Sequence, residues 1–485
     1  MGTALVLATS LGTAMSAQSD ITIGMVLEPP NLDPTGGAAA AIDEVVYANV
    51  FEGLTRFDSN GAIIPALAKE WEISDDGLTY TFTLNSGVKF HDGTDMDAQD
   101  VKFSLERAMA EDSTNAQKAL FADIVSVEAR DATTVVVNLS QPNGSFLFNM
   151  AWGDAVIVAP ESADNNGTNP IGTGPFVFVD WAQGDKVVLA KNPDYWGDEV
   201  ALESVTFKFI SDPSAAFAAM MAQDVDAFPN FPASETLPQF EADPRFKVIV
   251  GATEGETILS INNQSSPLDD VRVRHAIAHA INRQDIIDGA MSGFGTPIGT
   301  HFNPSNPDYL DLTEQSDYDP QQAMALLTEA GVSDLVLRMK LPPPPYARRG
   351  GEIIAAQLRA VGIETEITNL EWAQWLEEVF TAKDYDLTIV SHTEPFDIGI
   401  YARDDYYFNY DSKEMQAIIA ELNVTADPAA RTELLHKAQR RIADDYVNGY
   451  LFQLAKTGVA NARINGLWEN SPTQANDMTG VSWSE

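Results

Sequence analysis

The chain has 485 residues, 45% hydrophobic and 21% charged, which is the composition of a folded globular protein too long for a single core. Its formal net charge of −42 argues against nucleic acid and anionic membranes as partners, and the absence of cysteine excludes disulfides, thiolate catalysis and cysteine-bound metals. The acidic residues are spread along the whole chain, which is typical of a solvating surface.

An apolar run at 4–14 is too short to span a membrane, and small residues that suit a signal peptidase follow it at 14–18. We therefore predict that residues 1–17 are the remnant of an export signal and that the protein is periplasmic. The basic region of a signal is missing, since the first lysine or arginine is Arg56, so the alternative is a buried strand or a tail. A lipid anchor is not expected, because no cysteine stands at the cleavage region.

The first strongly patterned stretch lies at 66–109. Large apolar residues alternate with threonine over 78–84, which predicts a half-buried strand, and a short second strand is expected at 88–90. Asp97 is a predicted helix N-cap, with Asp100 three positions later and an apolar stripe along the helix. The stretch is predicted to form a strand–turn–strand–turn–helix unit.

The remaining segments alternate between strand and helix patterns, which predicts a mixed α/β protein. A strand–helix–strand order at 335–341, 351–361 and 363–367 predicts two parallel strands covered by a helix. Further strands are expected at 21–26, 125–130, 134–139, 205–210, 246–250, 257–262, 385–390, 450–454 and 459–460, and further helices at 213–221, 320–330 and 428–445.

Several motifs occur in an order that carries a family resemblance. They are Leu32-Asp33-Pro34, YANVFEGL at 47–54, the stretch 66–109, GTGPF at 172–176, KNPDYWG at 191–197, and the segment 271–283. Together they make the chain from Ile21 to about Leu467 resemble the large periplasmic solute-binding proteins of peptide- and nickel-type ABC transporters. The resemblance implies a large three-lobed α/β fold with mixed sheets and a ligand cleft closed by a hinge.

The same resemblance implies how the chain is divided. The expected boundaries are 18–55, 172–265 and 458–485 for lobe I, 56–171 for an inserted lobe II, and 266–457 for lobe III. The implied function is capture of a solute between lobes and its delivery to an ABC permease and its ATPase, by a monomeric binding protein. The expected ligand is a peptide or a related amine-bearing solute.

Other ligands and other functions stay open at this point. Relatives in the resembled family also carry oligosaccharides, opine-like compounds, haem or nickel chelates, and an extracytoplasmic enzyme or chaperone on the same fold is a further alternative. Against an enzyme, the sequence lacks GxSxG, Walker and HExxH motifs. His275 and His279 have a zinc-compatible spacing, but no third ligand is evident, so neither a metal site nor a cofactor is predicted.

The first candidate binding segment is a loop of small residues that includes Gly37, Ala40 and Ala41. Such a loop lets another molecule approach its backbone closely. In the related binding proteins this segment lies on the ligand. The alternative is that it only begins a helix over 42–50.

A second candidate follows the prolines at 342–345, where Tyr346, Arg348 and Arg349 precede a predicted helix. Some dipeptide-binding relatives place a carboxylate-binding arginine in this loop, and a guanidinium can hold a carboxylate with two hydrogen bonds. Alternatively, the arginines meet solvent or nearby acids. Trp372 aligns with an aromatic residue that contacts ligand in peptide-binding relatives, or else it belongs to the core.

A third candidate is the loop after the predicted strand at 385–390. In peptide-binding relatives it carries a tryptophan and then an aspartate that pairs with the peptide amino terminus. Here His392 replaces the tryptophan, and Glu394 or Asp397 must replace the aspartate if an amine is bound. We therefore predict that the ligand contacts Ser391, His392, Thr393, Glu394 and Asp397.

Overall fold

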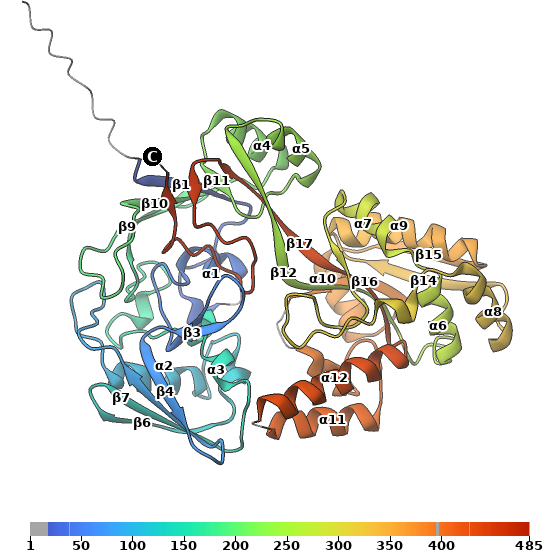
Figure 1. Cartoon of the computed structure of the whole chain (residues 1–485), viewed down its shortest axis with the longest axis horizontal. Coiled ribbons are helices and arrows are strands. Elements are labelled where there is room, and N and C mark those ends of the chain that lie inside the picture. Colours follow the sequence, from blue (N-terminus) through green and yellow to red (C-terminus); the bar gives the residue numbers. More distant parts are fainter. Residues whose placement is uncertain (1–17, 38, 394–396, 426, 485) are drawn as a thin grey trace, which may run out of the picture.

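A computed structural model describes residues 18–37, 39–393, 397–425 and 427–484. They form two bodies that are joined by two long antiparallel strands, β12 (Phe246–Ile261) and β17 (Asn448–Asn461) (Figure 1). The mixed α/β class predicted from the sequence is confirmed. The predicted export signal lies outside the described residues. None of the helices in the described part of the chain is both long and apolar enough to cross a membrane.

The first body contains most of the chain before β12 together with the C-terminal segment (Figure 1). One core lies between α1 and the strands β1 and β8–β10, and a second lies beneath the four-stranded sheet β4-β5-β7-β6 and helix α2. The elements are β1 (Asp20–Met25), α1 (Ala40–Val46), β2 (Thr55–Phe57), β3 (Ile63–Pro65), β4 (Ala68–Ile73), β5 (Thr79–Leu84), α2 (Ala98–Met109), β6 (Ile124–Asp131), β7 (Thr134–Leu139), α3 (Phe146–Asn149), β8 (Phe176–Ala182), β9 (Lys186–Lys191), β10 (Ser204–Phe209), α4 (Pro213–Ala222), β11 (Ala227–Phe228), α5 (Leu237–Glu241), β18 (Ile464–Asn465) and β19 (Ser482–Trp483), with 3-10 turns η1 (Pro34–Gly36), η2 (Lys118–Phe121), η3 (Gly153–Ala155), η4 (Ala163–Asn165) and η5 (Ser234–Thr236).

The patterned stretch folds largely as its residues predict. Apolar side chains of β5 are buried while its threonines are half-buried, and α2 begins at Asp97, which forms a capping box with Asp100. The strand expected at 88–90 is wrong. Lys89 makes only an isolated bridge to Asp95, because a tight turn with Gly93 at φ 89° reverses the chain immediately.

The second body contains the parallel pair β14 and β15, the strand β16, and helices that cover this part of the sheet. A separate aromatic-rich core lies against α11 and α12. The elements are α6 (Val271–His279), α7 (Arg283–Met291), β13 (Thr296–Pro297), η6 (Thr313–Ser316), α8 (Pro320–Ala330), β14 (Leu335–Leu341), α9 (Pro345–Ala360), β15 (Ile363–Asn369), α10 (Trp372–Trp375), the π-helix η7 (Leu376–Thr381), β16 (Leu387–His392), η8 (Asp397–Ala402), α11 (Lys413–Val424) and α12 (Pro428–Asp444).

Helix α9 begins earlier than the sequence suggested. The predicted start at Gly351 is wrong, because Pro345 occupies the first helical position, where the missing N–H of proline is tolerated. Gly351 lies inside the helix against β14, and a Cβ there would approach Cδ1 of Leu341 to 2.4 Å. Close packing on the sheet therefore explains a glycine that resembled a helix boundary.

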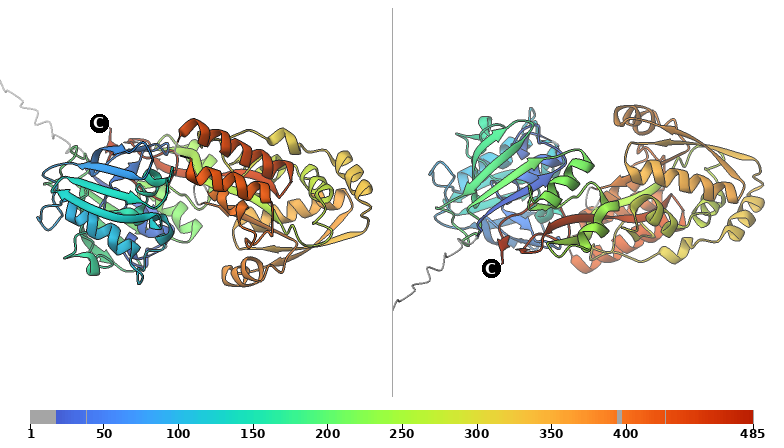
Figure 2. Two further views of the ribbon diagram at one scale, coloured as in Figure 1. Left: turned by 90° about the horizontal axis from the view of Figure 1, so that it is seen from below. Right: turned by 90° about the horizontal axis from the view of Figure 1, so that it is seen from above.

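The two bodies share one sheet. Within the described residues it is 11-stranded, in the order β15-β14-β16-β12-β17-β11-β1-β10-β9-β8, with β13 paired to β17 off this path. The breaks predicted within β12 and β17 are wrong: each segment is one continuous strand, and the ladder between them shifts register between Ala252 and Glu256 and again between Thr257 and Ile258. Views from below and above show the two bodies side by side along the long axis, with this irregular ladder between them (Figure 2).

Candidate functional site

A cavity of about 180 Å³ opens where the first body, the irregular ladder and the second body meet. Side chains from α1 and the ladder contribute to one wall, and the loop after β16 contributes to another. We call it the interbody cavity, and its lining residues are Ala40, Glu44, Trp152, Asn230, Thr253, Glu254, Gly255, Thr393, Leu454, Ser471, Pro472, Thr473 and Gln474.

The interbody cavity is acidic. The carboxylate of Glu44 on α1 accepts one hydrogen bond, from Nδ2 of Asn230 at 3.3 Å. The carboxylate of Glu254 on β12 accepts one long hydrogen bond, from Nδ2 of Asn303 at 3.5 Å. Burial raises the pKa of Glu44 to about 7, against the hydrogen bond from Asn230 and the charge of Lys456. Burial also raises the pKa of Glu254 to about 7, against the hydrogen bond from Asn303.

No lysine or arginine is among the described residues that line the interbody cavity. Lys456 acts on Glu44 through its charge, but its Nζ donates to the backbone oxygens of Trp468 and Asn470, and burial lowers its pKa to about 8. Neither Glu44 nor Glu254 forms an ion pair within the described part of the chain. A positively charged group entering the cavity would therefore meet two carboxylates whose ionised forms are poorly compensated.

The residues of the small-residue loop lie in different surroundings. Ala40 is the first residue of α1 and lines the interbody cavity, whereas Ala41 is buried in the core of the first body. Gly37 lies just beyond η1 and packs near Ile42, so that a Cβ at Gly37 would come within 2.7 Å of its Cδ1. A helix does begin in this loop, at Ala40, and the binding prediction for the loop stays a prediction.

None of the residues named for the second candidate segment lines the interbody cavity, but the hydroxyl of Tyr346 is hydrogen-bonded to the backbone of Ser391 in the third candidate segment. Arg348 donates to the backbone oxygen of Leu370 at 3.1 Å and to Oε1 of Glu371 at 3.1 Å, and Arg349 is exposed on α9. Tyr346 is partly buried against the core of the second body. Trp372 is 41% exposed, with its ring 5.6 Å from that of Trp375. In this arrangement Arg348 already has a carboxylate partner of its own.

The third candidate segment reaches the cavity at Thr393. The hydroxyl of Ser391 lies beside Gly255, where a Cβ would approach it to 2.9 Å, and Glu394 lies outside the described residues. His392 is buried and, like Asp397, faces the interior of the second body.

Asp397 is held by two histidines. Its Oδ1 lies 2.6 Å from Nε2 of His301, and its Oδ2 lies 3.0 Å from Nδ1 of His392. Burial alone would raise the pKa of Asp397, but the charges and hydrogen bonds of the two imidazoles lower it overall. One of the two carboxylates predicted to receive an amine is therefore already hydrogen-bonded by side chains of the protein itself, and the other, Glu394, lies outside the described residues.

Sequence reasoning missed four residues around this region: Glu44, Trp152, Glu254 and His301. Glu254 and its neighbour Gly255 fall at the irregular ladder, so an acid beside glycine between two apolar runs was the available signal. Glu44 interrupts an apolar helix, which is a weaker signal. Nothing in the local sequence marks Trp152 or His301, which are brought to their positions by tertiary contacts alone.

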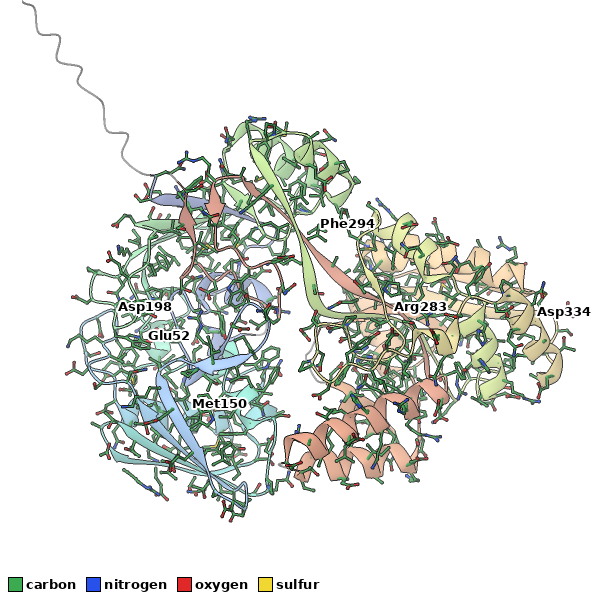
Figure 3. The ribbon with its side chains drawn as sticks, viewed as in Figure 1. Glu52, Met150, Asp198, Arg283, Phe294 and Asp334 are labelled. Carbon is green, nitrogen blue, oxygen red and sulfur yellow. The ribbon has the colours of Figure 1, made fainter. Side chains whose placement is uncertain are left out.

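Three motifs of the resemblance meet inside the first body, at the buried side chain of Glu52, which is not among the residues that line the interbody cavity (Figure 3). Its carboxylate accepts hydrogen bonds from Oγ1 of Thr173 at 2.8 Å, the hydroxyl of Tyr195 at 2.9 Å and Nε1 of Trp196 at 2.9 Å. Glu52 comes from YANVFEGL, Thr173 from GTGPF, and Tyr195 and Trp196 from KNPDYWG. The motifs therefore describe a structural junction rather than the solute site.

Comparisons with known proteins agree in sequence and in fold. The sequence model of "Bacterial extracellular solute-binding proteins, family 5 Middle" matches residues 62–414. A dipeptide-binding protein of Escherichia coli is 30% identical over 427 residues, covering 78% of this chain and 78% of that protein. Heme-binding protein A of Haemophilus influenzae is 30% identical over 399 residues, covering 73% of this chain and 71% of that protein.

Among solved structures, the periplasmic binding protein DppA of Helicobacter pylori, in complex with the peptide STSA, matches with a TM-score of 0.80. The match covers 97% of this chain and 99% of that chain at 24% sequence identity. At this identity the likeness establishes a shared fold.

Proposed function

Because the chain belongs to family 5 of the bacterial extracellular solute-binding proteins, we propose that its interbody cavity captures a peptide or a related amine-bearing solute for an ABC importer. The family predicted from the motifs is confirmed. The chain is the extracytoplasmic binding component, and the permease with its ATPase is the partner to which it delivers the solute. We further propose that it works in the periplasm.

One observation carries the choice of ligand. Glu44 and Glu254 enter the interbody cavity from different elements, each with a pKa of about 7, and no lysine or arginine is among the described lining residues. A solute ammonium would favour the ionised form of both carboxylates and so relieve the cost of their burial. The dipeptide-binding relative from Escherichia coli supports an amine-bearing ligand.

The size of the cavity narrows the ligand further. A volume of about 180 Å³ is below the roughly 300–1,000 Å³ of pockets that enclose drug-sized ligands, which favours a short solute over an oligopeptide. Trp152 supplies an aromatic wall, and Asn230 and Gln474 supply amides that can hydrogen-bond a peptide group.

Binding is coupled to movement of the bodies about the irregular ladder between β12 and β17. The separate hydrophobic cores support the division into lobes I, II and III inferred from the resemblance. Thr253 and Glu254 lie where the register shifts, so a solute that contacts them also contacts the hinge. For this to signal to a permease, the solute must bind the closed arrangement more tightly than the open one.

The proposal is tested by measuring the thermal stability of ligand-stripped protein in the presence of a panel of candidate solutes. The panel contains dipeptides, the same dipeptides with an acetylated amino group, oligosaccharides, haem and nickel–histidine. A free dipeptide at a hundred times its dissociation constant should add about 2.7 kcal/mol of stability, whereas its acetylated form, which lacks the charge, should add little.

Two other results would contradict the proposal. Equal stabilisation by free and acetylated peptides would mean that the carboxylates do not bind the amine. Stabilisation by an oligosaccharide alone would keep the importer role and reject the ligand. Arg348→Ala distinguishes binding of the ligand amine by the cavity acids from binding of a ligand carboxylate by Arg348. The variant should leave affinity unchanged in the first case and weaken it in the second.

A further inference from the structure

We propose that His301, His392 and Asp397 form a resident binding site for a divalent transition-metal ion such as Zn²⁺, beneath the wall of the interbody cavity. Two imidazole nitrogens and one carboxylate are a common donor set for zinc and related metals, with a fourth position left for water. The site goes beyond solute capture, because its donors lie inside the second body.

The three donor atoms already converge. One imidazole nitrogen from each histidine and a carboxylate oxygen of Asp397 all lie within 4.8 Å of one another. A tetrahedral ion with ligands at about 2.0–2.2 Å separates its donors by roughly 3.3 Å. Asp397 now lies 2.6 and 3.0 Å from the two nitrogens, so small side-chain movements suffice to admit an ion.

Both histidines also have the second partner that metal-binding imidazoles usually have. Nδ1 of His301 lies 3.1 Å from the hydroxyl of Tyr401, and Nε2 of His392 lies 3.2 Å from the hydroxyl of Tyr407. Such partners fix the ring orientation and leave the opposite nitrogen directed at the metal. Both tyrosines are themselves buried, so the orientation is set by the core of the second body.

The charge around the site favours a cation. Glu256 is 4% exposed and lies near enough to Asp397 for their charges to repel. Its carboxylate accepts a hydrogen bond from Nδ2 of Asn303 at 2.8 Å, and neither acid is paired with a lysine or arginine within the described residues. A divalent ion bound by Asp397 would offset both buried charges.

The position of the site also suggests what the ion would do. It would join the segment that carries His301 to the end of β16 and the start of η8, which flank the loop that reaches the cavity at Thr393. Asn303 bonds both Glu256 and Glu254, so the same segment also positions an acid of the cavity. The ion would thus act as a structural clamp behind the solute site.

Measurement of bound zinc tests the proposal. The protein is stripped of chelatable ions and reloaded with Zn²⁺, and His301→Gln and His392→Gln are the variants. The wild-type chain should retain about one equivalent of zinc, and each variant should retain less than about a tenth of that. His279→Gln is the matched control. Its Nε2 lies 2.9 Å from Nε2 of His275 on α6, and its Nδ1 lies beside the backbone oxygen of Asp317 and not beside a carboxylate. This variant should keep the wild-type zinc content.

Visible absorption of bound Co²⁺ gives a second readout on the wild-type protein, should a variant fail to fold. A tetrahedral Co²⁺ spectrum that Zn²⁺ abolishes supports the site. Zinc content at background in the wild type, or content unchanged in both histidine variants, overturns it. Zinc lost in Glu254→Gln but kept in His301→Gln would also overturn it, because the ion would then lie in the solute cavity.

Discussion

Glu52 is a buried glutamate and Glu254 a half-buried one, and their surroundings differ in one decisive respect. Glu52 accepts three hydrogen bonds of 2.8 to 2.9 Å from Thr173, Tyr195 and Trp196. Glu254 accepts a single long hydrogen bond, 3.5 Å from Nδ2 of Asn303, and faces a cavity. Burial raises the pKa of both, but at Glu52 the three donors oppose that rise directly.

The difference separates structure from function. A carboxylate whose partners are all supplied by the chain holds that chain together, and its removal leaves several buried donors unsatisfied. A carboxylate that is buried without sufficient partners costs stability, and it is retained where a ligand supplies the missing charge. Glu44 resembles Glu254 in this respect, since its carboxylate accepts a hydrogen bond from the side-chain amide of Asn230 at 3.3 Å.

The largest effect is expected at the saturated glutamate. Glu52→Ala leaves the donors of Thr173, Tyr195 and Trp196 buried without an acceptor, at about 1–3 kcal/mol each, so it should lower the free energy of unfolding by at least about 3 kcal/mol. Urea denaturation measures this loss. Glu52→Gln should cost less, because its amide oxygen still accepts from two donors.

The exposed Glu70 on β4 provides the control for that experiment. Glu70→Ala should change the free energy of unfolding by no more than about 0.5 kcal/mol. A similar small change in Glu52→Ala would mean that the junction of the three motifs does not stabilise the first body.

The next effect concerns the solute and not the fold. Glu254→Gln removes a charge that faces the interbody cavity, so it should weaken binding of an amine-bearing ligand by about 10- to 100-fold without lowering stability. Isothermal titration calorimetry measures the affinity. Glu371→Gln is the matched control, because Glu371 pairs with Arg348 outside the cavity; equal losses in the two variants would remove Glu254 from the site.

The same contrast explains how far the sequence could lead. Local patterns predicted elements whose residues satisfy one another nearby, such as the capping box of α2 and the parallel strands β14 and β15. Motif order identified the family, because the Glu52 junction needs fixed partners. The cavity instead combines α1, Trp152, the ladder and the C-terminal segment. The contact between Asp397 and His301 could not be foreseen, because the two residues are 96 positions apart in the chain.

A smaller effect is expected from pH. A bound ammonium requires ionised Glu44 and Glu254, whose pKa values are both about 7 in the free protein. Lowering the pH from about 7.5 to 6.5 protonates them, so affinity should fall roughly threefold for each carboxylate that contacts the amine, with protons released on binding at neutral pH. Calorimetry in two buffers of different ionisation enthalpy measures that release. Affinity independent of pH over this interval would show that neither acid contacts the ligand.

A last effect is expected for Glu44 in the free protein. The pKa of Glu44 is raised by folding from 4.5 to about 7, so its contribution to stability is fully present below about pH 4.5 and is lost as the pH rises through 7. Glu44→Gln removes a charge that burial disfavours, so it should stabilise the protein above pH 7 by roughly 1–3 kcal/mol, since the pKa of about 7 already includes the opposing effects of Asn230 and Lys456. The gain should vanish below about pH 4.5, where wild-type Glu44 is neutral in both states. Urea denaturation of the two proteins at pH 8 and pH 4.5 measures the difference, and a gain that persists at the lower pH would trace the effect to packing and not to charge.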